Sequence, residues 1–178
     1  MLPVSVNLSA RNLQDYELPD LVGGLLERWQ IPGEWLKIEI TESSLMADPA
    51  RALEALRHLR ALGVQVAIDD FGTGYASLAH LKQLRVDVLK IDRSFVRELQ
   101  RERSDRTIVR ATVDLAHDLE LRVVAEGVED RATAEYLADI GCDHAQGYYF
   151  ARPLAAEELT RWLRSTPPSW ATGLRKVA

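Results

Sequence analysis

The chain has 178 residues, a mass of 20.0 kDa and 47% hydrophobic residues, enough to build one substantial core. Its net charge of −5 argues against a nonspecific nucleic-acid binder, which would be basic, so no direct DNA binding is expected. The single cysteine, Cys142, excludes an internal disulfide and a cysteine cluster for zinc. No apolar run approaches the roughly 18 residues of a membrane-spanning helix. No signal peptide is evident in these residues, so a reducing compartment, the cytoplasm, is expected.

Six short apolar runs, rich in β-branched residues, each end in a polar group. This pattern is typical of buried parallel strands that carry polar side chains to their carboxyl ends. The run 64–68 is the clearest, because two adjacent aspartates and a glycine-rich turn follow it. In chain order, the six runs end at Asn7, at Glu39, at Asp69 with Asp70, at Lys90 followed by Asp92, at Glu126 and at Gln146.

Amphipathic stretches lie between the apolar runs, with apolar residues three or four positions apart. This spacing predicts helices over 18–29, 50–62, 107–119, 133–140 and 156–163. Pro49 and Ser104 are expected near helix starts, and Gly63 and Gly141 at helix ends. The charged run 97–106 mixes signs and is expected to be a solvated loop and a helix start. Uninterrupted alternation of strands and helices predicts a parallel α/β fold.

Polar groups at the end of every strand favour a TIM-like (β/α) barrel. An open doubly wound sheet would instead concentrate its ligand at one switch point. A complete barrel has about 250 residues, so six strand–helix units predict an incomplete barrel that lacks about two units of eight. The first strand begins almost at residue 1, so the absent part is expected to be N-terminal. The open edges would need a cover, such as a second copy of the chain, swapped elements or a rearrangement.

The strand ends carry the candidate metal ligands. Carboxylates that gather at one end of a sheet repel one another unless a cation lies between them. Oxygen donors favour magnesium, manganese or calcium over zinc. Alternation along 37–41 places Glu39 on the face opposite Ile38 and Ile40, towards the barrel interior. The candidate ligands are Asn7, Glu39, Asp69, Asp70, Asp92 and Glu126.

The adjacent aspartates suggest one particular chemistry. Asp69 and Asp70 could bridge two metals, an arrangement used for in-line attack on a phosphate ester. Lys90 would then hold a water molecule or neutralise developing charge. The alternative for Lys90 and Asp92, which lie two positions apart on one face, is a structural ion pair inside the barrel.

Six motifs follow in order along the chain: VNLSA at 6–10, EITES at 39–43, DDFGTGY at 69–75, KIDRSFV at 90–96, AEGVE at 125–129 and QGYYF at 146–150. With these motifs the chain resembles the EAL-domain phosphodiesterases of bacterial cyclic di-GMP signalling. Any one motif would be weak, whereas six at sensible spacing are specific. The resemblance implies a modified (β/α)₈ barrel that hydrolyses one phosphodiester of cyclic di-GMP to linear pGpG with magnesium or manganese.

The resemblance also implies a two-metal site. Asn7, Glu39 and Asp69 correspond to ligands of the first metal. Asp69, Asp70 and Glu126 correspond to ligands of the second metal. Glu126 is therefore counted among both the metal ligands and the catalytic residues.

The resemblance implies roles for five further residues. Lys90 and Asp92 correspond to a catalytic pair that orients metal-bound water. Glu129 and Gln146 correspond to groups that contact the substrate or support those that do. Glu42 corresponds to a residue that braces the loop 71–77, which couples the site to a dimer interface. A homodimer is therefore expected, and fused sensor or cyclase domains are compatible with the resemblance.

The Glu-Ala-Leu motif that names the family marks a departure from the resemblance. In the family this motif lies upstream of the strand ending in Asn7, supplies a ligand of the first metal and is followed by a substrate-binding arginine. Here the letters occur only at Glu54-Ala55-Leu56, inside a predicted helix, and are interpreted as coincidence. Residues 1–165 are therefore expected to be a truncated EAL domain, impaired or inactive alone, and 166–178 a tail.

Two other functions remain open at the level of sequence. One is a non-hydrolysing receptor or regulatory module for cyclic di-GMP. The other is a magnesium-dependent barrel enzyme that abstracts a proton next to a carboxylate, which also places Lys, Asp and Glu at strand ends. The adjacent aspartates and the glycine-rich loop after them favour phosphodiester cleavage.

Overall fold

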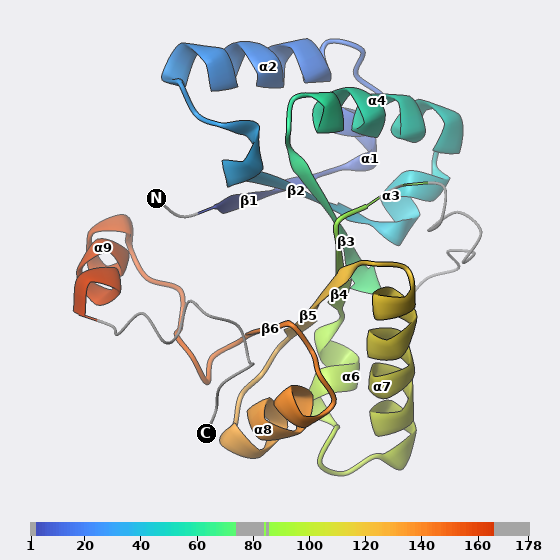
Figure 1. Cartoon of the computed structure of the whole chain (residues 1–178), viewed down its shortest axis with the longest axis vertical. Helices are drawn as coiled ribbons and strands as arrows, with labels where there is room; N and C mark the ends of the chain where they lie inside the picture. Colours follow the sequence, from blue (N-terminus) through green and yellow to red (C-terminus); the bar gives the residue numbers. More distant parts are fainter. Residues whose placement is uncertain (1–2, 74–83, 85, 166–178) are drawn as a thin grey trace. The chain divides into compact units, whose positions relative to one another are not determined.

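The polypeptide alternates strands and helices along its length in a computed structural model, which describes residues 3–73, 84 and 86–165 (Figure 1). The chain divides into two units, residues 1–90 and residues 91–178. Within the described residues the sheet contains six strands, and their order in the sheet follows their order in the sequence. This succession confirms the predicted parallel α/β organisation. Among the same residues, every helix falls short of the length and apolarity that crossing a membrane requires.

The first unit consists of strands joined by helices. Its strands β1, β2 and β3 pair in parallel, with Asn7 opposite Glu39 and Thr41 opposite Asp69. The elements are β1 (Val4–Leu8), α1 (Ala10–Leu13), α2 (Leu18–Trp29), the 3-10 turn η1 (Gly33–Trp35), β2 (Leu36–Thr41), α3 (Glu42–Met46), α4 (Pro49–Ala61), β3 (Gln65–Phe71) and β4 (Val88–Ile91), whose last residue belongs to the second unit.

The predicted helix signals of the first unit are confirmed. Helix α2 begins and ends where the periodicity placed it. Helix α4 begins at Pro49, and the Asp48 side chain caps it by accepting the N–H of Arg51 at 3.1 Å. Gly63 follows α4 with φ +83°, a left-handed conformation that glycine adopts without steric cost.

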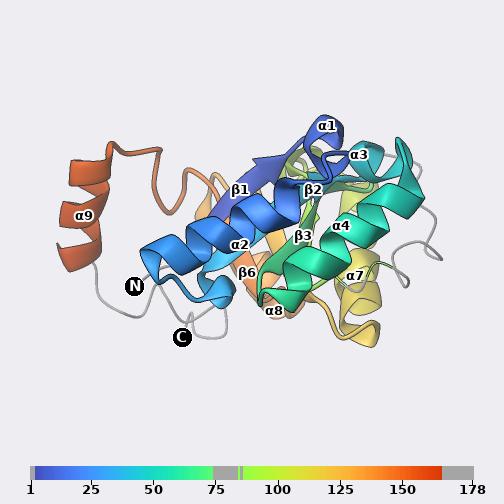
Figure 2. The same cartoon turned by 90° about the horizontal axis from the view of Figure 1, so that it is seen from above.

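Apolar side chains of β2 and β3 form the core of this unit. Ile38, Ile40 and Ile68 are buried, as are Leu56 and Leu59 of α4. Each such side chain stabilises the fold by about 1.5–3 kcal/mol relative to exposure. Helices α2 and α4 lie side by side over these strands (Figures 1 and 2).

The outer edge of the first unit remains apolar and exposed. Val4 and Val6 of β1 are both exposed, and so are Leu21 and Trp29 of α2. Exposed apolar surface of this kind marks interaction sites. The expected cover for this edge, a second copy of the chain or a rearrangement, stays a prediction.

The second unit continues the same alternation. Strands β5 and β6 pair in parallel, with Glu126 opposite Gln146. Helix α7 begins four residues earlier than predicted, within the charged run. The elements are α6 (Arg93–Arg97), α7 (Arg103–Asp118), β5 (Arg122–Glu126), α8 (Arg131–Asp139), β6 (His144–Gln146) and α9 (Ala156–Ser165).

Helix α9 is the least buried element of this unit. The predicted helix is confirmed, but none of its residues is buried, and Leu159 and Leu163 are exposed. Both views show α9 apart from α7 and α8 (Figures 1 and 2). The predicted tail, 166–178, lies outside the described residues.

Three short helices follow strands directly and were not predicted from periodicity. They are α1, α3 and α6, and each has a polar N-cap whose side chain accepts a backbone N–H. The caps are Ser9, Thr41 and Asp92. Four or five residues are too few for an apolar period to be visible, so only the cap residues could have signalled these helices.

In each unit, an aspartate ahead of one strand contacts the backbone of the strand before it and a side chain of the helix that leads into that earlier strand. Asp87, ahead of β4, accepts the Val66 N–H at 2.8 Å and pairs with Arg60 at 2.6 Å. Asp143, ahead of β6, accepts the Val123 N–H at 2.9 Å and contacts His117 at 2.9 Å. Each aspartate therefore ties the first residues of a strand to the helix before it. Partial burial by itself would raise the pKa of Asp143, but the hydrogen bonds from Val123 and His117 lower it below the ordinary value.

Asp143→Asn is expected to lower the free energy of unfolding by about 1 kcal/mol at pH 5, because it removes a charge-assisted hydrogen bond. A carboxyl whose pKa is lowered by folding stabilises the fold above its unfolded pKa of 3.8. This contribution is lost as the pH falls through the lower folded-state pKa. Urea unfolding of both proteins at pH 5 and at pH 3 measures the difference, which should shrink at pH 3.

The matched control is Asp118→Asn, an exposed carboxylate at the end of α7. It should change stability by less than about 0.5 kcal/mol at either pH. A difference for Asp143→Asn that is equal at both pH values would contradict the assigned direction of its pKa.

Cys142 is a buried, free thiol beside this aspartate. Burial raises its pKa to about 12. The thiol therefore stays protonated at neutral pH and packs as a small apolar side chain.

Candidate functional site

Lys90 of β4 lies between two carboxylates of the first unit. Its Nζ donates to Glu39 Oε2 at 2.5 Å and pairs with Asp69 Oδ1 at 2.9 Å. Lys90 is 5% exposed and Glu39 is 9% exposed. The ammonium group of Lys90 thus lies between two of the acids for which a metal ion was predicted, and the metal itself stays a prediction.

The strand register explains this grouping. Glu39 of β2 is opposite Asn7 of β1 and Ala67 of β3. Asp69 lies two positions beyond Ala67, so its side chain points to the same face of the sheet as Glu39. Asn7, which is exposed, shares that face at the outer strand. The structure therefore brings these predicted ligands to one face of the first unit.

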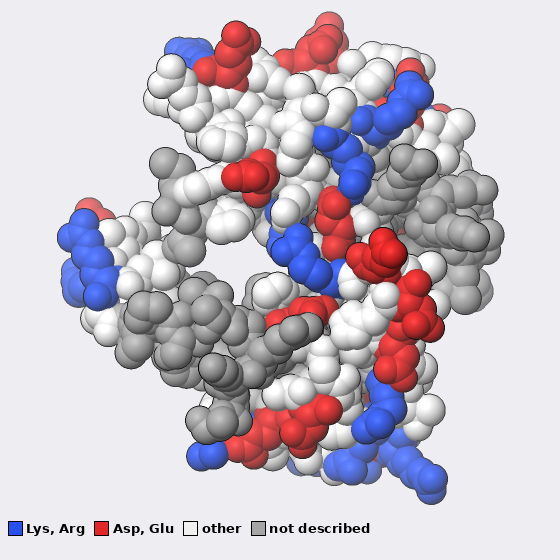
Figure 3. Space-filling view, viewed as in Figure 1, with Lys and Arg blue, Asp and Glu red and all other residues white. Residues whose placement is uncertain are grey.

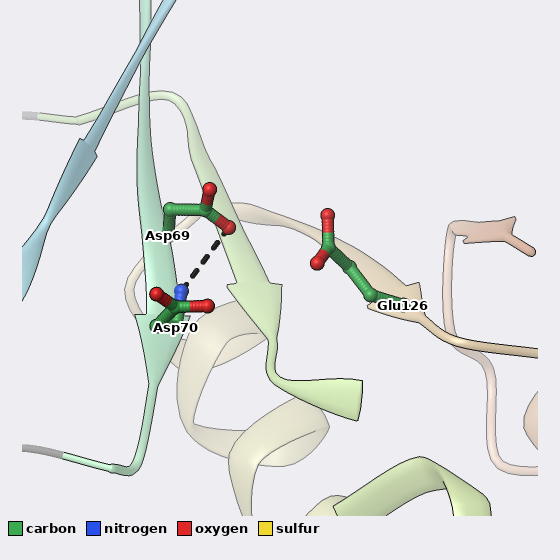
Figure 4. A group of neighbouring side chains, drawn as sticks. All are labelled: Asp69, Asp70 and Glu126. Carbon is green, nitrogen blue, oxygen red and sulfur yellow. Dashed lines mark hydrogen bonds between the residues drawn. The ribbon is translucent and has the colours of Figure 1, made fainter. Parts of the chain in front are cut away.

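Asp70 has an unusual backbone conformation at the end of β3. Its φ is +54°, in the left-handed region that non-glycine residues seldom adopt. Its N–H donates to Asp69 Oδ1 at 3.1 Å, and its carbonyl accepts the Thr73 hydroxyl at 2.9 Å. In a regular strand, neighbouring side chains point to opposite faces. The left-handed backbone of Asp70 departs from that geometry, and the two carboxylates lie together at the end of β3 (Figure 4). Strain of this kind, about 1–3 kcal/mol, is characteristic of functional sites.

Asp92 has a structural contact that was not predicted. It follows β4 and caps α6, where its Oδ1 accepts the Ser94 N–H at 2.9 Å. The predicted role of Asp92 beside Lys90 in orienting water stays a prediction.

Glu42 is buried at the start of α3. Its Oε1 accepts the Gly72 N–H at 3.2 Å, which ties α3 to the first residues of the loop after β3. Residues 74–77 of the loop that Glu42 is expected to brace lie outside the described residues. The bond to Gly72 is compatible with the predicted bracing role.

Two glycines hold the loop after β5 in the second unit. Gly127 has φ +73°, and a Cβ there would lie 2.5 Å from the Arg93 Cβ. A Cβ on Gly147 would lie 2.1 Å from the Val128 carbonyl oxygen. The Val128 N–H donates to the Gln146 carbonyl at 3.1 Å. Close backbone approach therefore fixes the AEGVE and QGYYF motifs against each other.

These motifs line a pocket of about 170 Å³ in the second unit. Three predicted site residues, Glu126, Glu129 and Gln146, lie together in its wall. Sequence reasoning missed the other polar side chains there, which are Arg93, Arg97 and Tyr148. The signal for the arginines was present, since they lie four positions apart in the KIDRSFVR segment and so share a helix face.

The structure offers carboxylate ligands of the kind a hard cation prefers. Asp69, Asp70 and Glu126 each present an oxygen that could ligate a metal, the first two from the end of β3 and the third from the end of β5 (Figure 4).

On the face shown in Figure 3, acidic and basic side chains are interspersed among the described residues, with no extended basic surface.

Comparison with known proteins decides the family. The EAL domain family model matches residues 1–153. The chain belongs to the EAL domain family. The match spans all six motifs on which the resemblance rested, so membership of the family is confirmed, while the roles of single residues stay predictions.

Named relatives of this EAL domain include two proteins of Pseudomonas aeruginosa. The bifunctional diguanylate cyclase/cyclic di-GMP phosphodiesterase MucR is 45% identical over 156 residues, which cover 88% of this chain and 23% of MucR. The cyclic di-GMP phosphodiesterase NbdA is 42% identical over 176 residues, which cover 99% of this chain and 22% of NbdA. The chain thus spans about a fifth of the length of these relatives.

A solved structure described as the MucR phosphodiesterase in complex with c-di-GMP has the same fold. It superposes with a TM-score of 0.84 at 44% identity, over 88% of this chain and 64% of that one. This similarity confirms the predicted fold class, a TIM-like α/β arrangement of strand–helix units.

Proposed function

We propose that this EAL domain hydrolyses one phosphodiester bond of cyclic di-GMP to give linear pGpG, with two magnesium or manganese ions. The proposal is supported by relatives named as cyclic di-GMP phosphodiesterases and by the similar structure described with c-di-GMP bound. The observation that carries it is the Asp69–Asp70 pair, held at one strand end by a left-handed backbone beside Lys90. Family membership also favours phosphodiester chemistry over the proton-abstracting alternative.

The proposed metal ligands are five oxygen donors at strand ends. Bound metals would lower the pKa of a water molecule and neutralise charge on the phosphate. Asp69 is proposed as the shared ligand, because its carboxylate lies beside both Asp70 and Lys90. The full proposed set is Asn7, Glu39, Asp69, Asp70 and Glu126.

The remaining site residues are proposed to act on water and substrate. Lys90, buried between two acids, keeps an ammonium group at the site that donates hydrogen bonds to the attacking water or a phosphate oxygen. Asp92, on the helix that follows, is proposed to assist it. Glu129 and Gln146 are proposed to bind the nucleotide, since both line the pocket of the second unit.

We propose that the 178 residues alone hydrolyse little or no cyclic di-GMP. Glu54-Ala55-Leu56 lies inside α4, and Glu54 pairs with Arg51 of the same helix at 2.8 Å. The interpretation of these letters as coincidence is thereby supported, because Glu54 lies in the middle of a helix and pairs with a residue of that helix. These residues therefore provide one carboxylate fewer than the family resemblance implies.

The proposed partners rest on the same resemblance. A homodimer coupled to the site through Glu42, and fused sensor or cyclase domains, are proposed from the resemblance and from the multidomain name of MucR. The tail at 166–178 and the location in the cytoplasm stay predictions.

Cyclic di-GMP should be converted to pGpG when the polypeptide as its gene encodes it is incubated with magnesium or manganese, whereas the 178 residues alone should form little or no product. Chromatography of cyclic substrate and linear product over time measures both. Removal of the metal with EDTA should stop product formation. Calcium should inhibit, because its looser coordination misplaces the water.

The same samples distinguish the receptor alternative. Calorimetric titration with cyclic di-GMP reports binding independently of turnover. Tight binding without any pGpG from the metal-loaded polypeptide encoded by the gene would replace the enzyme proposal with the receptor.

A further inference from the structure

Arg97 donates two hydrogen bonds to one carboxylate oxygen of Glu129. Its Nε and Nη2 donate to Glu129 Oε1 at 3.0 and 2.6 Å. Arg97 is the last residue of α6, and Glu129 closes the AEGVE motif after β5. Both hydrogen bonds go to Oε1, and within the part of the chain that the structure describes Oε2 has no hydrogen-bond partner. The arginine therefore fixes the direction of the carboxylate and leaves one oxygen available.

This ion pair is poorly suited to a stabilising role. Both side chains are 48% exposed, and exposed pairs contribute little to the free energy of folding. The loop is already held by Gly127 against Arg93 and by the backbone bonds of Val128. What Arg97 adds is control of the Glu129 rotamer, which those backbone contacts do not determine.

The pair lies between two pockets of the second unit. The smaller, of about 170 Å³, also contains Glu126 and Gln146. The larger, of about 390 Å³, extends along Gln100 and Asp130. Arg97 and Glu129 line both pockets, so the Glu129 carboxylate forms part of the wall of each.

We propose that Arg97 is a positioning residue for nucleotide binding. This proposal rests on the proposed function of the domain. The arginine holds Glu129 so that Oε2 faces the smaller pocket and accepts a hydrogen bond from an N–H or O–H donor of cyclic di-GMP. A carboxylate fixed beforehand binds more tightly than one that must be ordered on binding. Arg97 acts through Glu129 and does not itself touch the reacting phosphate.

Arg97→Met tests this inference, because methionine keeps the apolar stem and removes all donors. Calorimetric titration with cyclic di-GMP should show affinity about tenfold weaker, and KM should rise while kcat stays within about twofold. Arg97→Lys, which keeps the charge but not the paired donors, should recover part of the affinity. Manganese affinity and the unfolding midpoint in urea should match wild type for both variants.

Two further variants make the test specific. Arg101→Met removes the same charge nearby, from a side chain that is 81% exposed, lines only the larger pocket and pairs with Glu98. Its affinity for cyclic di-GMP should match wild type. Arg97→Met combined with Glu129→Gln should bind no more weakly than Glu129→Gln alone, because the arginine acts through that carboxylate.

The outcomes separate this inference from the proposed function. Failure of the wild-type protein to bind cyclic di-GMP overturns both. Binding by wild type that is unchanged in Arg97→Met, or equally weakened in Arg101→Met, overturns the positioning role alone. Additive losses in the double variant would show that Arg97 acts without Glu129 and would also overturn it.

Discussion

In the polypeptide as its gene encodes it, Lys90→Met is expected to reduce turnover of cyclic di-GMP at least about a hundredfold and to destabilise the protein by about 3 kcal/mol in EDTA. The loss of turnover follows from the removal of a preorganised cation beside the reacting groups. The loss of stability has a separate cause, because Glu39 and Asp69 are left facing each other in a buried site without the ammonium group between them. Product chromatography and urea unfolding measure the two effects.

Divalent metal should partly restore the stability of Lys90→Met. A magnesium ion can replace the missing positive charge, so magnesium should raise the unfolding midpoint of the variant more than that of wild type. The double variant Lys90→Met with Asp69→Asn should be less destabilised than the sum of its single changes, because it also removes one of the repelling carboxylates. Strictly additive losses would mean that the Lys90–Asp69 contact contributes nothing to folding.

Asp69→Asn is expected to abolish detectable turnover and to weaken manganese binding tenfold or more. The amide is nearly the same size as the carboxylate but lacks its negative charge, and Asp69 is the ligand proposed to serve both metals. Loss of such an element costs roughly a hundredfold or more in rate. Calorimetric titration with manganese and product chromatography measure affinity and rate on the same preparation.

A matched control separates local from general charge effects. Asp20→Asn changes an exposed aspartate in the first turn of α2. It should leave manganese affinity and turnover at wild-type values. Equal manganese affinity in wild type and Asp69→Asn would remove Asp69 from the metal site, whatever the effect on rate.

Local patterns in the sequence determined the order of the elements and their polar ends. Helix α2 begins and ends where its periodicity placed it, because side-chain spacing along a helix is a local property. The start of α4 is also a local property, because the Asp48 cap and Pro49 act only within the first turn of the helix. The candidate site residues Glu39, Asp69, Asp70, Glu126 and Gln146 all stand in strands, as the apolar runs indicated.

Only the tertiary structure decided which of these groups meet. Lys90 pairs with Glu39, 51 positions away, because β2, β3 and β4 are neighbours in one sheet. The left-handed backbone of Asp70 depends on the turn that follows β3, where the Thr73 hydroxyl donates to the Asp70 carbonyl. The apolar periodicity of the sequence does not predict this conformation. Arg97 reaches Glu129 because Gly127 lets the loop after β5 approach α6 closely. Contacts of this kind join residues far apart in the chain, so local periodicity and capping carry no information about them.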